Sequence, residues 1–146
     1  MEKIGLVTIT YNSADVIRDF LESTFSQTFQ NFVIYIIDNN SQDDTLEILT
    51  EYTDSRIKLV KNKKNDGVAK ANNQGIELAL KDNCTQVLII NNDVEFEKQL
   101  FDKMIQVQKD KNCSLVVPKM MYFDNSDYIW YAGSRFIKKK GFLPIH

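Results

Sequence analysis

Four runs of apolar, β-type residues, each followed by a segment with helical spacing, constrain the fold of this chain more than any other feature. The runs cover residues 3–10, 32–38, 56–60 and 86–90, and the second is free of charged residues until Asp38. A continuous apolar run is typical of a strand that is covered on both faces. Because short connections lead from strand to helix, the order predicts an α/β fold with a mostly parallel sheet flanked by helices on both faces.

The helices are predicted from the spacing of apolar residues and from candidate caps. After the first strand, apolar residues recur at helical spacing from Val16 onward, and Asn12 or Ser13 is the expected N-cap. Ser41 and Asp44 stand in capping-box spacing, which predicts that a second helix begins there.

The second half of the chain continues the pattern and then loses it. A third helix is expected to contain residues 69–80, and an amphipathic helix is expected over residues 97–110. We expect a fifth strand over residues 114–118, which Pro118 ends. Beyond it the sequence is aromatic and irregular, with one short strand expected at residues 129–131.

Length and charge limit the classes of protein. With 146 residues and 43 % hydrophobic content, we expect a single domain, residues 1–146, with a substantial core. A net charge of -2 argues against nucleic-acid binding, and no apolar run approaches the length of a membrane span. Cys84 and Cys113 have no metal-site spacing and are expected to be reduced thiols in a cytoplasmic protein. The only histidine is the last residue, His146, so a histidine-based triad is not expected within the chain.

Clusters of polar residues follow three of the predicted strands. They are residues 10–13, 38–41 and 91–93, and the last of them, "NND", directly follows an apolar run. Parallel α/β sheets bind ligands at the carboxyl ends of their strands. We therefore expect these clusters to share one binding rim.

The chemistry of this rim differs from that of the common nucleotide-binding folds. After the first strand stands "TYNSAD" in place of GxGxxG, and there is no GxxxxGK[ST] loop, which argues against simple Rossmann dehydrogenases and P-loop enzymes. Without a glycine loop to cradle phosphates, a nucleotide diphosphate would need a divalent cation. Mg²⁺ commonly takes one or two carboxylates together with substrate phosphates, and Asp93 at a strand end suits that role.

Four segments in this order and spacing carry a family resemblance. "VTITYNSADVI", "IIDNNSQDDT", "NDGVAKANNQGI" and "LIINNDVE" resemble the nucleotide-sugar half of the inverting family 2 glycosyltransferases with a GT-A fold. Within that family they are most similar to the bacterial rhamnosyltransferase-like branch. The resemblance covers residues 4 to about 135 and implies a GT-A, Rossmann-like architecture.

The resemblance also implies an activity and its partners. It implies that a hexosyltransferase moves a sugar from a nucleotide-diphosphate donor to an acceptor hydroxyl with inversion, in bacterial cell-surface polysaccharide synthesis. The implied cofactor is Mg²⁺ or Mn²⁺, and the implied acceptor is a saccharide or a lipid-linked saccharide. A cytoplasmic location at the inner face of the membrane, peripheral membrane association and homo-oligomer formation are further expectations.

The matching motifs assign roles to individual residues. "NND" occupies the place of the family's DxD motif, so Asp93 resembles the metal ligand, Asn91 stands at the first acidic position, and Asn92 lies toward the ribose. Asp38 matches the base-recognising aspartate. The resemblance implies this set of nucleotide-sugar-binding residues: Thr10, Tyr11, Asn12, Asp38, Asn40, Asp66, Gly67, Asn72, Asn73 and Asn92.

Each role has a simpler alternative. Asp38 could begin a turn, Asp93 could cap a helix, and Gly67 could serve only the turn that contains it. Asn72 and Asn73 could make tertiary contacts, since asparagine is a mediocre helix former. Two other functions also stay open: a nucleotidyltransferase that makes the activated sugar, and a non-catalytic interaction module that uses the aromatic tail.

The chain departs from the family pattern in its catalytic base. The family's general base is an acidic residue on the acceptor side, and no matching motif precedes His146. Asp124 and Asp127 lie in an apparent surface turn, and "GSRF" at residues 133–136 resembles the beginning of the acceptor half. We therefore expect a chain that ends before the acceptor half, binds donor without transferring sugar, and self-associates through the aromatic segment 128–136.

Overall fold

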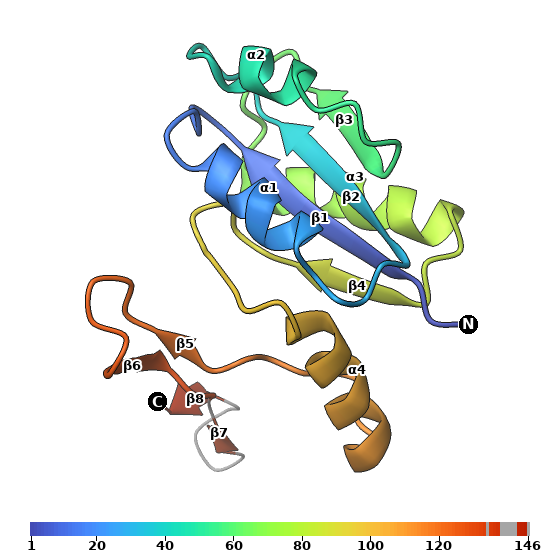
Figure 1. Ribbon diagram of the computed structural model, residues 1–146, viewed down its shortest axis with the longest axis vertical. Helices are drawn as coiled ribbons and strands as arrows, with labels where there is room; N and C mark the ends of the chain where they lie inside the picture. The colour runs from blue at the N-terminus through green and yellow to red at the C-terminus, as the bar shows by residue number, and fades with distance from the viewer. Residues whose placement is uncertain (134, 138–142, 146) are drawn as a thin grey trace. The chain divides into compact units, whose positions relative to one another are not determined.

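The computed structural model describes residues 1–133, 135–137 and 143–145 of the chain. These residues fall into two compact units, Met1–Leu100 and Phe101–His146. The first unit contains a parallel sheet with helices, and the second contains a helix and short antiparallel strand pairs (Figure 1).

The first unit is built on four parallel strands in the order β3-β2-β1-β4. Figure 1 shows α1 in front of this sheet and α3 behind it, so helices cover both faces. The α/β prediction is confirmed. No helix among the described residues is long and apolar enough to cross a bilayer. The elements of this unit are β1 (Ile4–Thr10), α1 (Ile17–Phe25), β2 (Phe32–Asp38), α2 (Thr45–Thr50), β3 (Ile57–Lys61), α3 (Val68–Lys81) and β4 (Gln86–Ile89).

Strand register brings the ends of the strands to one edge. Thr10 pairs with Asp38 in the β1 and β2 ladder, and Asp38 pairs with Lys61 in the β2 and β3 ladder. The Ile90 amide donates to the Val7 carbonyl and extends the contact between β4 and β1 by one residue. The polar residues that follow β1, β2 and β4 therefore emerge on the same side of the sheet, as the sequence predicts.

The face of the sheet under α3 is packed closely enough to require glycine. Val7 of β1, Tyr35 of β2, Ala79 of α3 and Cys84 form a buried cluster. A Cβ atom on Gly75 of α3 would lie 2.3 Å from Cγ1 of Val7, far inside van der Waals contact. The absence of a side chain at Gly75 thus sets how near α3 lies to β1.

We expect Gly75→Ala to lower the free energy of unfolding by about 2 kcal/mol, because overpacking at a buried β-branched side chain outweighs the gain in helix propensity. Urea denaturation followed by circular dichroism measures the change. Val7→Ala in the same chain removes the clashing methyl groups, so the double variant is expected to lose less stability than the sum of the two single changes. Additive losses would contradict the packing explanation.

The second unit contains α4 (Leu100–Lys111) except for its first residue, together with β5 (Met120–Met121), β6 (Ile129–Tyr131), β7 (Arg135–Ile137) and β8 (Leu143–Ile145). β5 pairs with β6 and β7 pairs with β8, both antiparallel. The Tyr128 amide donates to the Asn125 carbonyl, which closes the turn before β6. Asp124 and Asp127 are exposed in this turn, where the sequence places them.

The predicted fifth strand over residues 114–118 is wrong. These residues form no strand; the Leu115 and Val117 side chains are exposed, and the nearest strand is β5, which begins after Pro118. A strand requires paired backbone groups, and proline has no N–H to contribute to a ladder. The short strand expected at residues 129–131 is present as β6.

The predicted N-caps are also wrong. Helix α1 begins at Ile17, and the Ser13 carbonyl, not a side chain, accepts the Val16 and Ile17 amides. The Asn12 side chain instead accepts the Gln42 amide at 2.8 Å. The Asn12 side chain thus contacts a distant segment, while the Ser13 hydroxyl accepts the Tyr11 amide within the turn. Helical spacing reveals neither contact.

The predicted capping box at the second helix is absent for the same kind of reason. Helix α2 begins at Thr45, and Asp44 makes no side-chain capping bond. The Ser41 hydroxyl donates to the Asp38 carboxylate rather than to the helix. The neighbouring residue Asp43 instead accepts the Thr45 amide at 3.1 Å.

Candidate functional site

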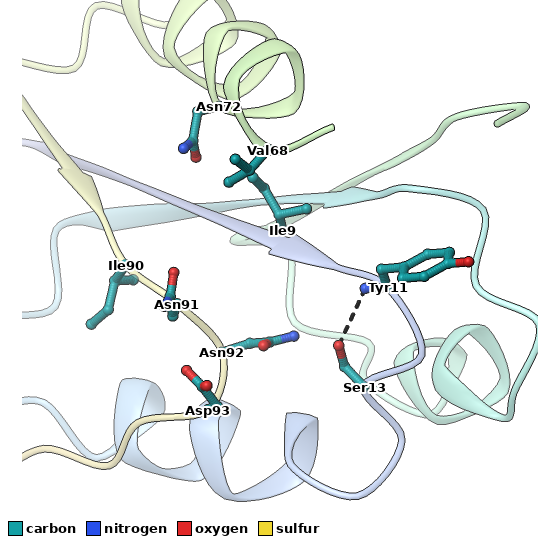
Figure 2. Close-up of a pocket in the computed structure, with 9 residues that line it drawn as sticks. All are labelled: Ile9, Tyr11, Ser13, Val68, Asn72, Ile90, Asn91, Asn92 and Asp93. Carbon is teal, nitrogen blue, oxygen red and sulfur yellow. Dashed lines mark hydrogen bonds between the residues drawn. The ribbon is translucent and has the colours of Figure 1, made fainter. Parts of the chain in front are cut away.

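A cavity of about 250 Å³ lies at the carboxyl ends of β1 and β4, beside the first turns of α3 (Figure 2). Its walls combine apolar side chains with asparagines and one carboxylate. The residues that line it are Ile9, Tyr11, Ser13, Val68, Asn72, Ile90, Asn91, Asn92 and Asp93.

The cavity brings together five of the residues that the sequence nominates. Tyr11 comes from the turn after β1, Asn72 from α3, and Asn91, Asn92 and Asp93 from the turn after β4. In Figure 2 the β4 turn lies opposite Tyr11 across the opening. These segments are far apart in sequence, and the strand-end rule is what predicts that they meet.

Four lining residues are not predicted from the sequence. The sequence places Ile9 and Ile90 in strands and gives Val68 no role, because the apolar character of all three favours packing. The sequence predicts Ser13 only as a helix cap, whereas its hydroxyl accepts the Tyr11 amide at 3.2 Å and lies in the wall (Figure 2). The alternation of side chains along β1 could have indicated Ile9, since it flanks Thr10 on the opposite face.

Asn92 carries an unsatisfied donor at the cavity. Its Nδ2 atom is buried and has no hydrogen-bond partner among the described residues, a property shared only with the Thr8 hydroxyl. Buried polar atoms are nearly always paired, and leaving one unpaired costs on the order of 1–3 kcal/mol. An acceptor oxygen on a bound molecule would remove this cost, which favours a ligand-binding role for Asn92.

Asp38 lies beside the cavity rather than in its wall. Its side chain is fully buried, and its carboxylate accepts four hydrogen bonds. Oδ1 accepts the hydroxyls of Thr10 at 2.8 Å and Ser41 at 2.5 Å, while Oδ2 accepts the amides of Asn40 at 3.1 Å and Ser41 at 3.0 Å. These bonds occupy both oxygens, so Asp38 holds the turn that follows β2, and direct contact with a base stays a prediction.

Asn40 is one of two nominated asparagines that adopt a left-handed backbone. Its φ is 69°, and that of Asn12 is 52°. Asparagine tolerates this region better than most residues with a side chain. Asn40 and Asn12 thus serve the two turns next to the cavity, and neither lines it.

The turn before α3 contains Asp66 and Gly67, which were also nominated. Asp66 pairs with Lys70 at 2.9 Å and with Lys64 at 3.4 Å. The hydrogen bond from Lys70 holds the pKa of Asp66 below its ordinary value. Gly67 has a φ of 84° and immediately precedes the helix, so its conformation explains the glycine there. Asn73 is exposed on α3, and the cavity lining includes its neighbour Asn72 instead.

The donor atoms at the cavity fit a divalent cation only in part. Asp93 is the one carboxylate in the lining, and Asn91 offers a neutral amide oxygen. No group of three or more histidine, cysteine, aspartate or glutamate side chains suited to a metal occurs within the described ranges. Mg²⁺ retains waters and substrate phosphates among its ligands, so these two residues suit a cation that shares its coordination with a diphosphate.

The sequence model of glycosyl transferase family 2 matches residues 6–145, nearly the whole chain. The chain belongs to this family. The family prediction is confirmed, while the rhamnosyltransferase-like branch stays a prediction. Enzymes of the family generally use a divalent metal.

Two curated relatives illustrate the match. The glycosyltransferase GlyG of Streptococcus pneumoniae is 26% identical over 140 residues, which are 92% of this chain and 46% of GlyG. WfaP of Escherichia coli, named a UDP-Glc:alpha-D-GlcNAc-diphosphoundecaprenol beta-1,3-glucosyltransferase, is 39% identical over 79 residues, 54% of this chain and 32% of WfaP. This chain therefore spans less than half the length of either relative.

A solved structure shows the same fold. TarS of Staphylococcus aureus, residues 1–349 in complex with UDP-GlcNAc, is similar with a TM-score of 0.66 at 22% identity. The likeness covers 83% of this chain and 38% of the TarS chain. The GT-A architecture expected from the resemblance is thereby confirmed.

Proposed function

We propose that this chain is the donor-binding part of a glycosyltransferase that takes a sugar from a nucleotide-diphosphate donor and attaches it, with inversion, to an acceptor hydroxyl. The observation that carries the proposal is the cavity at the ends of β1 and β4, where Asp93, Asn91 and Asn92 converge with Tyr11. Membership of family 2 supports the same activity.

In this proposal each wall of the cavity binds a different part of the nucleotide sugar. The Tyr11 ring is half exposed at the opening and offers an aromatic surface to the base. The unpaired Nδ2 of Asn92 donates a hydrogen bond to an oxygen of the nucleotide sugar, and Asn72 of α3 supplies further hydrogen bonds on the opposite wall. Ile9, Val68 and Ile90 exclude water from part of the site.

The chief chemical requirement of the reaction is to stabilise the negative charge that develops on the leaving group. Breaking the bond to the anomeric carbon leaves a diphosphate with an additional negative charge, and Asp93 with Asn91 would hold a divalent cation that neutralises it. The position of Asp93 at the end of β4 would fix where that cation binds. Of the lining residues it is the only carboxylate, so the proposed general base is a residue outside this cavity.

The proposed setting follows from the relatives. WfaP is named for a lipid-linked acceptor and a UDP-sugar donor, which supports a saccharide or lipid-linked saccharide acceptor for this chain too. We place the reaction in bacterial cell-surface polysaccharide synthesis, on the cytoplasmic side of the membrane. A nucleotidyltransferase is less well supported, because the turn after β1 has neither glycine nor a basic residue with which to hold a triphosphate.

Thermal unfolding in a panel of nucleotide sugars tests the proposal. A ligand at about 100 times its dissociation constant adds about 2.7 kcal/mol of stability, which raises the Tm of a chain this size by about 5 to 10 °C. We expect such a shift with UDP- or GDP-sugars in the presence of Mn²⁺, and a smaller one with EDTA. No shift with any member of the panel would contradict the proposed function.

A further inference from the structure

The turn after β1 is fixed by side chains of a distant segment. Four successive amides, those of Tyr11, Asn12, Ser13 and Ala14, all donate to side-chain oxygens. The first bond is local, within the turn itself. The other three are made to residues 41–45, which lead from β2 into the first residue of α2, about 30 residues further along the chain.

Two of these bonds continue through a hydroxyl to a carboxylate. The Asn12 amide donates to Ser41 Oγ at 3.0 Å, and that hydroxyl donates to Asp38 Oδ1 at 2.5 Å. The Ser13 amide donates to Thr45 Oγ1 at 2.7 Å, and that hydroxyl donates to Asp43 Oδ1 at 2.5 Å. We call these two arrangements the hydroxyl bridges.

Each hydroxyl bridge has a fixed direction. A hydroxyl has one hydrogen, and because the carboxylate can only accept, that hydrogen must point toward the carboxylate. The lone pairs of the hydroxyl then point toward the amide. Bonds to an ionised acceptor are about twice as strong as neutral ones, so the carboxylate sets the position of the amide two bonds away.

Asp43 holds the second bridge from both sides. Its Oδ2 accepts the Ala14 amide at 3.0 Å, while its Oδ1 accepts both the hydroxyl and the amide of Thr45. Burial acts to raise the pKa of Asp43, but the bonds from Thr45 and Ala14 outweigh it and hold the pKa below its ordinary value. A single carboxylate thus ties the turn after β1 to the first residue of α2.

The bridges end at the wall of the cavity. Tyr11 and Ser13 line it, whereas Asp43 and Thr45 do not. The Asn12 backbone between them is in the left-handed region, with φ at 52°. Such a conformation costs about 1–3 kcal/mol and persists only when its surroundings hold it. The bridges supply those surroundings.

We propose that Thr45 and Asp43 are positioning residues for the donor: through the second hydroxyl bridge they hold the Tyr11 and Ser13 wall in its binding conformation without contacting the ligand. The inference rests on the proposed function, and it extends the donor site to two residues outside the cavity.

The test compares Thr45→Val with Thr45→Ser in the 146-residue chain. Valine keeps the shape of threonine and removes the bridge, while serine keeps the hydroxyl. We expect Thr45→Val to weaken UDP binding in the presence of Mn²⁺ by about three- to thirtyfold in Kd, measured by calorimetry. Thr45→Ser is expected to stay within about twofold of the parent. Thr50→Val is the matched control, since that hydroxyl bonds only the Glu47 carbonyl in the same helix.

Amide hydrogen exchange supplies a readout that does not depend on the ligand. Thr45→Val is expected to speed exchange of the Ser13 amide about tenfold or more, with little change in the β1 amides. Asp43→Asn is expected to do the same for Ala14 and to weaken UDP binding, whereas Asp44→Asn removes a charge at an exposed neighbour and is expected to change neither. The Asp43 variant keeps the inference testable if Thr45→Val does not fold.

Three results would overturn the inference. The first is that Thr45→Val or Asp43→Asn binds UDP as tightly as the parent. The second is that Thr45→Ser binds UDP as weakly as Thr45→Val, and the third is that hydrogen exchange of the amides of residues 13 and 14 is unchanged in these variants. A parent chain that binds neither UDP nor GDP with Mn²⁺ contradicts the proposed function itself, and the inference falls with it.

Discussion

Asp93→Ala is expected to abolish metal-dependent nucleotide binding while leaving the fold intact. Asp93 is the only carboxylate in the cavity lining, and it is exposed at the end of β4, so its removal leaves only neutral oxygens for a divalent cation. Even residues that merely support a metal ligand are worth about 10- to 100-fold in metal affinity, so losing the ligand itself should cost about 100-fold or more. Calorimetric titration of UDP with and without Mn²⁺ measures the effect.

Glu95→Ala is the matched control for this prediction. Glu95 is an exposed carboxylate two residues further along, and it lies outside the cavity lining. The control loses the same charge and is expected to bind UDP and Mn²⁺ like the parent. If Asp93→Ala kept the parent's Mn²⁺-dependent affinity, or if Glu95→Ala lost it equally, Asp93 would not be the metal ligand.

Asp38→Asn is expected to lower the free energy of unfolding by about 2 to 5 kcal/mol, because it replaces one acceptor oxygen of a fully buried carboxylate by a donor. That oxygen faces either two hydroxyls or two amides. The two amides, of Asn40 and Ser41, cannot reverse their bonds. The hydroxyls of Thr10 and Ser41 can turn, but only by giving up their present bonds to Asp38. The midpoint of urea denaturation reports the loss.

The same variant separates two roles for Asp38. A residue that reads the base and does nothing else would lose nucleotide affinity with little change in stability. The four bonds predict the reverse order of effects, with a large loss of stability. Asp44→Asn, at an exposed position, is expected to leave the denaturation midpoint unchanged. A stable Asp38→Asn with parent-like unfolding would contradict the holding role.

The strands of the first unit could be predicted almost to the residue. The bounds of β2, Phe32–Asp38, match the prediction because a run that is apolar on both faces has no alternative to burial in a sheet. The meeting of Tyr11 with Asn91, Asn92 and Asp93 could also be predicted, since parallel strands place their ends at one edge.

The starts of the helices could not be predicted from local sequence. Asn12, Ser13 and Ser41 have side chains suited to capping, and in the structure all three bond elsewhere. Capping rules do not say whether such a side chain bonds the helix, a nearby residue such as Tyr11 or Asp38, or a distant one such as Gln42. The same limitation hid the roles of Asp43 and Thr45.

The role of Asp38 shows a second limitation. Its position at a strand end and the family resemblance both indicate a contact with the base, which stays a prediction, whereas the four hydrogen bonds that its oxygens accept from the chain could not be predicted. Occupancy of a carboxylate depends on hydroxyls and amides contributed by Thr10, Asn40 and Ser41, whose orientation only the folded turn determines. Position along a strand predicts where a polar group lies, but it does not predict what the group binds.

The most direct test of the account is a crystal structure of the chain with a UDP-sugar and Mn²⁺, with the metal located by its anomalous scattering. We expect the manganese peak at a coordination distance of about 2.0 to 2.2 Å from a carboxylate oxygen of Asp93 and from oxygens of the diphosphate. We also expect the base beside Tyr11 and a donor oxygen within hydrogen-bond distance of Asn92. A nucleotide bound away from the cavity between β1, β4 and α3, or a metal coordinated without Asp93, would contradict the account.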